Sequence, residues 1–239
     1  MEGLLTVLVP VYNERDCIGP LALALTEFLN ASSSTKILFI NDGSTDGSEA
    51  AIEAICGADS RYGFISFIQN KGLSTALKAG IDHCNTPFVG YIDADLQTHP
   101  ADFPKLIEFM NDYDLVMGYR KDRKDTLIKK ASSTIANSFR QWLLKDDIID
   151  TGCPLKIMRT DLAKQMPFFR GMHRFIPNMV MLLGGSVKQV PVQHFPRYAG
   201  QAKYNLMNRM TGPFIDSVAF RWMQKSKIQY TISRKAGCR

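Results

Sequence analysis

The chain has 239 residues, of which 45% are hydrophobic and 22% charged, and its formal net charge is +6 at pH 7. These fractions are typical of a folded globular protein and exclude a largely disordered chain, and the length favours a single domain. The five cysteines are odd in number and form no Cys-x-x-Cys pair, which favours a reduced, cytosolic protein over one stapled by disulfides.

The termini and the charge distribution narrow the class of protein further. An apolar run over residues 4–10 has no basic stretch before it, so it predicts a first strand rather than a signal peptide. The longest other apolar run, residues 175–183, reaches about half the length needed to cross a bilayer. After Arg197 the only acid is Asp216, against eight lysines and arginines. We therefore expect no transmembrane helix and a tail that seeks anionic partners.

Apolar, strand-like runs alternate with helix-like stretches in the first half of the chain. The predicted strands cover residues 4–10, 36–41, 64–69 and 88–92, and the predicted helices between them cover residues 17–29, 49–55 and 76–84. This alternation predicts a parallel sheet with crossover helices, and ligands of such sheets gather at the carboxyl ends of the strands.

Each predicted strand runs directly into polar residues. The four continuations read Pro-Val-Tyr-Asn-Glu (10–14), Asn-Asp-Gly-Ser-Thr-Asp-Gly-Ser (41–48), Asn-Lys-Gly (70–72) and Asp-Ala-Asp-Leu-Gln (93–97). Any one of them is ordinary turn chemistry. Four at the same edge of one sheet predict a ligand site.

The fourth continuation has the residues of a cation site. On an extended segment Asp93, Asp95 and Gln97 would emerge on one side, so three oxygen donors would converge. Mg²⁺ and Mn²⁺ prefer oxygen ligands and keep part of their shell for water or substrate phosphates. A metal and diphosphate site is therefore expected here. The histidines lack ligand spacing and are expected to be structural: His83, His99 and His194.

Together these motifs resemble the inverting nucleotide-sugar glycosyltransferases of family 2, which have the GT-A fold, over nearly the whole chain. The resemblance implies an α/β GT-A domain with a mostly parallel sheet over residues 1–204, and a basic amphipathic helical tail without transmembrane helices over residues 205–239. It also implies that Asp95 and Gln97 bind Mg²⁺ or Mn²⁺. The residues that it assigns to the nucleotide sugar are Pro10, Tyr12, Glu14, Asp42, Lys71 and Asp93.

Motifs of the second half resemble the polyprenyl-phosphate group of that family, which includes dolichyl-phosphate mannose synthase and undecaprenyl-phosphate sugar transferases. They read Met-Gly-Tyr-Arg (117–120), Asp-Thr-Gly-Cys-Pro-Leu-Lys (150–156), His-Arg-Phe-Ile-Pro (173–177) and His-Phe-Pro-Arg-Tyr-Ala-Gly-Gln-Ala-Lys-Tyr (194–204). The resemblance implies a lipid phosphate acceptor whose phosphates contact Arg120, Arg197 and Lys203.

The chain departs from this group at three points. Ala202 and Tyr119 stand where the group usually has serine, and two membrane helices that usually follow the catalytic domain have no counterpart here. We therefore expect a peripheral enzyme at the cytoplasmic face of the membrane, with a homo-oligomer or a separate anchoring protein left open as a partner.

Charge on the departing diphosphate must be stabilised during sugar transfer, and cations do this best in a water-poor site. An attacking hydroxyl would also need a base, whereas a phosphate acceptor is already ionised and needs cations to guide it.

Asp150 fits either a base or a turn cap. The basic residues that follow Arg120 fit either a solvated loop or an acceptor site. The expected catalytic set is Asp95, Arg120, Asp150, Arg197 and Lys203.

Residues 211–225 place six apolar side chains at helical spacing and predict an amphipathic helix. Such a helix either docks on the domain or a partner subunit, or lies in a membrane interface. The apolar stripe consists of Phe214, Ile215, Val218, Ala219, Trp222 and Met223.

The leading hypothesis is a metal-dependent inverting glycosyltransferase that moves a sugar from UDP or GDP to a polyprenyl phosphate such as undecaprenyl phosphate, for cell-envelope glycan biosynthesis. The alternative is a soluble family 2 transferase that acts on a hydroxyl of a saccharide or protein. A non-catalytic nucleotide-sugar-binding or nucleic-acid-binding module has only the basic charge in its favour, and the acidic metal motif argues against a nucleic-acid groove. No nucleic-acid partner is therefore expected.

Overall fold

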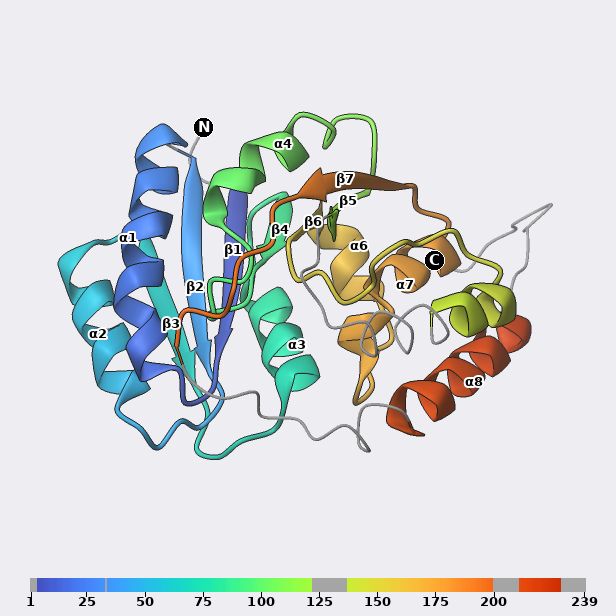
Figure 1. Cartoon of the computed structure of the whole chain (residues 1–239), viewed down its shortest axis with the longest axis horizontal. Helices are drawn as coiled ribbons and strands as arrows, with labels where there is room; N and C mark the ends of the chain where they lie inside the picture. Colours follow the sequence, from blue (N-terminus) through green and yellow to red (C-terminus); the bar gives the residue numbers. More distant parts are fainter. Residues whose placement is uncertain (1–3, 33, 122–136, 200–210, 229–239) are drawn as a thin grey trace, which may run out of the picture.

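A seven-stranded sheet forms the centre of the molecule, and helices cover both of its faces (Figure 1). The structure, a computed structural model, describes residues 4–32, 34–121, 137–199 and 211–228. Lys203 and the basic residues 123–130 lie outside these ranges, so the predictions about them have no structural counterpart here.

The strands follow the order β3-β2-β1-β4-β6-β5-β7 across the sheet. Their bounds are β1 Leu5–Val11, β2 Thr35–Asn41, β3 Tyr62–Ser66, β4 Phe88–Tyr91, β5 Leu115–Arg120, β6 Lys156–Arg159 and β7 Val187–Val192. The helices are α1 Arg15–Ala31, α2 Ser48–Ala58, α3 Leu73–His83, α4 Phe103–Ile107, α6 Thr160–Gln165, α7 Ile176–Leu182 and α8 Thr211–Ser226, with 3₁₀ turns η1 Pro100–Asp102 and η2 Met172–Arg174 and a further helix over residues 137–144.

Most neighbouring strands of the sheet run parallel, as predicted. The pairs β1–β2, β1–β4, β2–β3 and β5–β7 are parallel, and only β6 is antiparallel to its two neighbours, β4 and β5. Lys156, the first residue of β6, lies opposite Tyr91 at the end of β4 and opposite Met117 of β5. The chain between β5 and β6 therefore leaves and re-enters the sheet at the same edge.

Alternating side chains of the strands fill two hydrophobic cores. Val7 and Val9 of β1 pack in one core with Leu21 of α1, whereas Leu8 points to the opposite core and meets Leu77 of α3. All are buried, and each such side chain contributes about 1.5–3 kcal/mol through removal of apolar surface from water. Because both faces of β1 are covered, its sequence reads as a continuous apolar run rather than an alternating one.

Two predictions about strands need correction. The third strand begins at Tyr62, two residues before its predicted start, and ends at Ser66. The fourth ends at Tyr91, and the residues after it form a turn in which Leu96 has φ +58° and the Gln97 N–H donates to Asp95 Oδ1 at 3.1 Å. The expectation that Asp93, Asp95 and Gln97 alternate along an extended strand was therefore wrong, because the Asp95 side chain closes a local turn.

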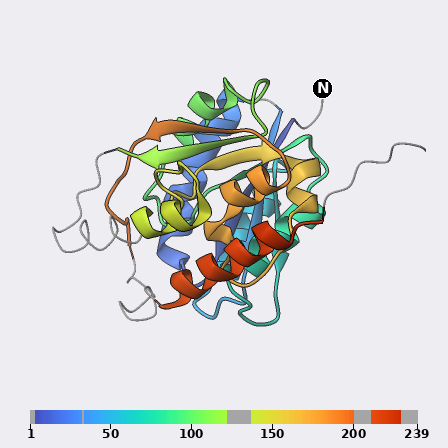
Figure 2. The same cartoon turned by 90° about the vertical axis from the view of Figure 1, so that its right-hand side faces the viewer.

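Helix α8 forms where it was expected and lies against the domain (Figure 2). It docks through a face other than the predicted apolar stripe. Phe220 is fully buried and stacks on Phe175 with ring centroids 5.4 Å apart, and Ser217 is buried beside it. Most of the predicted apolar stripe, in contrast, faces solvent. Within the described ranges, no helix has the length and apolar character needed to cross a membrane.

Hydrogen bonds between Ser74 of α3 and His173 attach the turn before α7 to helix α3. Ser74 Oγ accepts from the backbone N–H groups of Gly171 and His173 at 3.2 and 3.4 Å, and lies 2.9 Å from His173 Nδ1. Because the serine oxygen already accepts twice, its own proton goes to Nδ1, which must then be unprotonated. Burial, followed by the charges of Arg174 and Lys156, lowers the pKa of His173 to about 3.

This pair predicts a specific acid sensitivity. The unfolded chain binds a proton at His173 near pH 6.5, whereas the folded protein does so only near pH 3, so stability falls as the pH drops below about 6.5. At pH 5 the loss should reach about 1–2 kcal/mol. Urea unfolding of His173→Gln at pH 7.5 and pH 5 should show a smaller difference than the wild-type protein. The exposed His83→Gln is the matched control. If His173→Gln lost as much stability between pH 7.5 and pH 5 as the wild-type protein, the assignment would be contradicted.

Candidate active site

The predicted site residues of the first half gather at one edge of the sheet. This edge is formed by the carboxyl ends of β1, β2, β4 and β5, which share one direction. Pro10 lies within β1 opposite Ile40, and Tyr12 follows that strand with 37% of its surface exposed. The position agrees with the rule that open α/β sheets bind ligands beyond the carboxyl ends of their strands.

Close backbone contacts hold the first loops of this edge together. The Asn13 N–H donates to Ser44 Oγ at 3.0 Å, and its side-chain oxygen accepts from the Thr45 N–H at 2.7 Å. Gly43 has φ +67°, and a Cβ there would lie 2.5 Å from the carbonyl carbon of Gln69. Only glycine allows this approach, so the loops after β2 and β3 form one packed wall.

Asp42 joins the same two loops. Its carboxylate accepts from the backbone N–H groups of Lys71 and Gly72 at 2.7 and 2.8 Å and from Asn70 Nδ2 at 2.9 Å. Burial raises the pKa of Asp42, and the backbone hydrogen bonds act in the opposite direction. The structure thus shows Asp42 as the brace of the 70–72 loop, whereas its contact with a nucleoside remains a prediction, as does that of the exposed Lys71.

Three carboxylates concentrate negative charge at the ends of β1 and β4. Arg197 joins two of them, with Nη2 at 2.9 Å from Asp95 Oδ2 and Nη1 at 3.2 Å from Glu14 Oε1. The Tyr91 hydroxyl donates to Asp93 Oδ1 at 2.5 Å. Burial and then the negative charge of Asp95 raise the pKa of Asp93. These carboxylates attract positive charge, and the guanidinium of Arg197 supplies it in this structure.

Arg120 and Asp150 form a second, largely buried charge pair at this edge. Arg120 donates from Nε to Asp150 Oδ2 at 2.7 Å and from Nη2 to Oδ1 at 2.9 Å, and its backbone N–H adds a contact at 3.3 Å. Only 12% and 10% of the two side chains are exposed. The carboxylate that was predicted as either base or turn cap is therefore bound in a bidentate pair.

Lys156 is a site residue for which the sequence predicted no role. It is fully buried, its ammonium donates to the Cys153 carbonyl, and it lies 5.7 Å from the centre of the Tyr91 ring. Burial lowers the pKa of Lys156, and its charge lowers that of Asp93. The one available signal was a lysine within an apolar strand, since such a residue is seldom buried without a partner.

Residues 6–167 match the model of glycosyl transferase family 2, which spans more than half of the chain. The chain belongs to this family. Its carboxyl-edge loops, from Pro10 to the turn at Asp95, lie within the matched residues, so the expectation drawn from the sequence motifs is confirmed at the level of the family.

Relatives in family 2 include two bacterial polyprenyl-phosphate enzymes. Dodecaprenyl-phosphate galacturonate synthase of Rhizobium johnstonii is 30% identical over 209 residues, which cover 84% of this chain and 62% of that protein. Undecaprenyl-phosphate 4-deoxy-4-formamido-L-arabinose transferase of Sodalis glossinidius is 32% identical over 207 residues, which cover 84% and 63%. The chain thus spans less than two thirds of the length of these relatives.

Solved structures share the GT-A fold. Glucosyl-3-phosphoglycerate synthase from Mycobacterium tuberculosis, in complex with Mn²⁺, UDP and glucosyl-3-phosphoglycerate, superposes with a TM-score of 0.71 at 16% identity and covers 92% of this chain and 80% of that one. A mannosyltransferase from Pyrobaculum calidifontis, in complex with GDP-Man and Mn²⁺, gives a TM-score of 0.62 at 15% identity, with coverage of 83% and 59%. This likeness confirms the predicted fold class.

The donor set of this family 2 chain fits a divalent cation that shares its shell with substrate. In the described part of the chain no three acidic, histidine or cysteine side chains form a cluster that could hold a metal alone. Asp95 is, however, neutralised here by Arg197, and it raises the pKa of neighbouring Asp93 by repulsion. A divalent cation would relieve the same excess negative charge. Mg²⁺ is usually held in this way, by one or two protein carboxylates together with substrate phosphates.

The Arg120–Asp150 pair predicts a strongly non-additive mutant series. Arg120→Met should destabilise the protein by about 3 kcal/mol, because it leaves the Asp150 carboxylate buried without its countercharge. Arg120→Met/Asp150→Asn should recover much of this loss, since the charge is then removed with its partner. Chemical denaturation measures the loss in Arg120→Met, in Asp150→Asn and in the double variant. The control is Arg159→Met, from the exposed pair with Asp161, which should change little, and additive effects at Arg120 and Asp150 would refute the coupling.

Proposed function

We propose that the protein is a metal-dependent inverting glycosyltransferase that moves a sugar from a UDP- or GDP-sugar to a polyprenyl phosphate such as undecaprenyl phosphate, in the biosynthesis of cell-envelope glycans. The reaction takes place at the cytoplasmic face of the membrane, where such an acceptor presents its phosphate. The proposal rests on the family, on the arrangement of charge at the carboxyl edge of the sheet and on the names of the relatives.

The donor site is supported by the packed loops after β1, β2 and β3. Asp42 fixes the loop that carries Lys71, and Asn13 fixes the turn that carries Tyr12 and Glu14. In this proposal the wall holds the nucleoside through Pro10, Tyr12, Glu14 and Asp42, Lys71 lies near the base or diphosphate, and Asp93 reaches the ribose or phosphates. A preformed wall lowers the entropy lost when the nucleotide binds.

The structural observation that supports an anionic acceptor is the bidentate Arg120–Asp150 pair. A hydroxyl acceptor needs a base, and Asp150 is the residue whose place in the sequence suggested one. Both of its oxygens instead accept hydrogen bonds from the Arg120 guanidinium, so this carboxylate is engaged with a cation. A guanidinium has five N–H donors, so Arg120 retains N–H groups for a phosphate.

The relatives point to the same acceptor class. The names of the Rhizobium johnstonii and Sodalis glossinidius proteins refer to sugar transfer that involves dodecaprenyl phosphate and undecaprenyl phosphate. Arg197, together with Lys203 from the motif at 194–204, provides cations for the diphosphate and for the acceptor in this proposal. Asp95 and Gln97 would hold Mg²⁺ or Mn²⁺, which would stabilise negative charge on the departing diphosphate.

The activity predicts a metal-dependent lipid product. Purified protein with a radiolabelled UDP- or GDP-sugar, Mn²⁺ and undecaprenyl phosphate should yield an acid-labile labelled lipid, measured by extraction and chromatography. Asp95→Asn should lower the rate by about 100- to 1,000-fold, because the leaving diphosphate loses its charge stabilisation. The exposed Asp161→Asn is the control with the same chemical change.

Two outcomes would count against parts of this proposal. Full activity in the presence of EDTA would refute the metal requirement. Transfer to a saccharide or protein hydroxyl, with polyprenyl phosphate inert, would instead favour the soluble family 2 alternative.

Arg197 also predicts a competition at Asp95. Because the guanidinium and a cation would use the same carboxylate, Arg197→Gln should raise the affinity for Mn²⁺ without nucleotide by roughly fivefold, equivalent to about 1 kcal/mol for a partly exposed ion pair. Titration followed by the electron paramagnetic resonance signal of free Mn²⁺ measures it. Arg159→Gln, which removes the same charge at an exposed position, should leave the affinity unchanged. Equal or weaker Mn²⁺ binding by Arg197→Gln would exclude the competition.

A further inference from the structure

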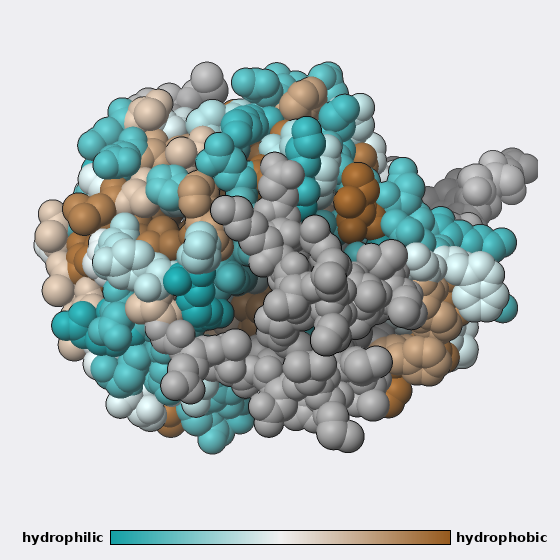
Figure 3. All heavy atoms as spheres, viewed as in Figure 1, coloured by the Kyte–Doolittle hydropathy of each residue, from teal (hydrophilic) through white to brown (hydrophobic). Residues whose placement is uncertain are grey.

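An apolar face that the fold leaves uncovered lies on α8 and the helix over residues 137–144. Both tryptophans of the chain belong to it, with 74% of Trp142 and 70% of Trp222 exposed. Figure 3 shows brown side chains over α8 at the lower right of the molecule. We call it the two-helix face, and its exposed members are Trp142, Phe214, Ile215, Val218 and Trp222, with Ile228 exposed two residues beyond the end of α8.

The two helices that carry this face are packed together. The rings of Phe139 and Phe214 stack with centroids 4.8 Å apart, and Gln224 of α8 donates to the Leu144 carbonyl at 3.4 Å. On its inner side α8 is held by the buried Phe220 against Phe175. The exposed side chains therefore stand on a fixed support rather than on a loose segment.

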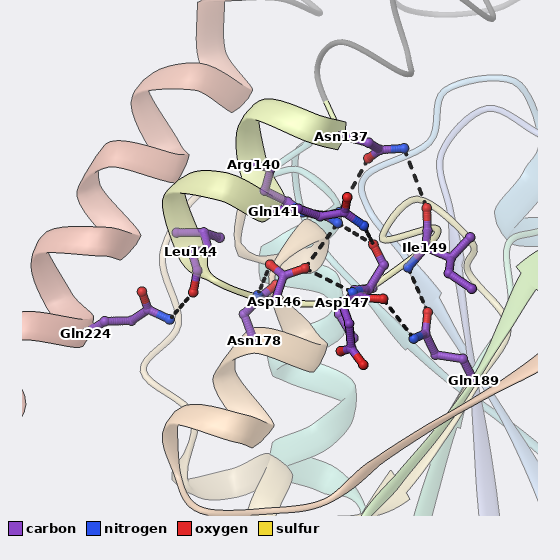
Figure 4. A network of polar contacts seen from close by, with 11 residues as sticks. Asn137, Arg140, Gln141, Leu144, Asp146, Asp147, Ile149, Asn178, Gln189 and Gln224 are labelled. Carbon is purple, nitrogen blue, oxygen red and sulfur yellow. Dashed lines mark hydrogen bonds and ion pairs between the residues drawn. The ribbon is translucent and has the colours of Figure 1, made fainter.

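A buried polar network fixes the helix over residues 137–144 in the same way (Figure 4). Arg140 is paired with Asp146 at 3.2 Å and also donates to the Ile148 carbonyl, and Asp146 accepts from Asn178 Nδ2 of α7 at 2.6 Å. Only 7% and 2% of the Arg140 and Asp146 side chains are exposed. With Arg140 anchored inward, Trp142 is left on the outer side of the helix.

The exposed charges near the ends of the two helices are mostly positive. Lys145, Lys225 and Lys227 are exposed there, against the exposed acid Asp147. The one acid of residues 211–228, Asp216, is turned inward: it pairs with Arg174 at 3.7 Å and packs on Gly171. The sequence beyond Ile228 adds Arg234, Lys235 and Arg239 and no acid.

Exposed tryptophans and aliphatic side chains next to lysines favour one kind of binding partner for the two-helix face. Exposed apolar patches with tryptophans mark contact surfaces, and tryptophan bordered by lysine and arginine suits the headgroup region of a bilayer. A second copy of this chain would bring two positively charged borders together, which costs free energy. Anionic headgroups would instead attract each lysine near the surface.

We propose that the two-helix face docks on the surface of a lipid bilayer that contains anionic lipid. The inference rests on the proposed function in one respect, since a lipid-linked acceptor requires the enzyme to work at a membrane. The face and the proposed acceptor site are also neighbours along the chain, since Asp150, the partner of Arg120, follows Leu144 by six residues.

Because the chain has two tryptophans and both lie on this face, its intrinsic fluorescence reports on docking directly. Addition of vesicles of phosphatidylcholine with phosphatidylglycerol should shift the emission of the full chain to the blue, and phosphatidylcholine vesicles should do so weakly. Trp142→Phe and Trp222→Phe separate the two signals. In co-sedimentation, Trp142→Ser/Trp222→Ser should bind the anionic vesicles at least about tenfold more weakly. Leu23→Ser and Ile68→Ser, at exposed apolar positions elsewhere, are the matched controls and should bind like the wild-type protein.

The outcomes separate the docking surface from the proposed function. An unchanged emission spectrum with anionic vesicles, or equal weakening by the Leu23 and Ile68 controls, would overturn the docking surface. A lipid-independent blue shift accompanied by a doubled mass in sedimentation would overturn it in favour of a second copy. Transfer to a short-chain, water-soluble polyprenyl phosphate without vesicles tests the proposed function alone, so vesicle docking without any transfer would refute that function and still support the docking surface.

Discussion

The negative charge that Glu14, Asp93 and Asp95 bring to one edge of the sheet is the constraint on which the site depends. Three carboxylates at the ends of two neighbouring strands are stable only where cations offset them, because burial makes an uncompensated charge costly. Arg197 offsets two of them, and the positive charge of Lys156 lowers the pKa of Asp93. A second cation could therefore take the place of the Arg197 guanidinium at Asp95, as the proposed function requires.

The compensating cations come from the second half of the chain, whereas the acids come from the first. Arg197 follows β7 and Lys156 begins β6, so neither belongs to the parallel unit that carries Glu14 and Asp93. Folding of the two halves is therefore coupled through charge as well as through the shared sheet. The same division separates the roles of the proposal, since the first half forms the donor wall and the second half supplies the groups for the acceptor.

The sequence predicted those features that local chemistry determines. The loops at 41–48 and 70–72 formed where turn residues indicated them, and α8 begins at the expected residue. It could not predict pairs that join distant segments, such as Arg120 with Asp150 or Ser74 with His173, because nothing in one partner specifies the other. The period of α8 showed an apolar stripe but not which face would be buried, since Phe220 lies outside that stripe and fills the core.

The reversed direction of β6 determines how freely the connection between β5 and β6 can vary in length. Since residues 121–155 leave and return at a single edge, their length can change without any rearrangement of strand order. The entropic cost of a longer connection is small, about 0.6 kcal/mol for each doubling. This excursion also carries Trp142 and Asp150, so a change in its length or sequence would alter the surroundings of both residues while the strands of the first half keep their order.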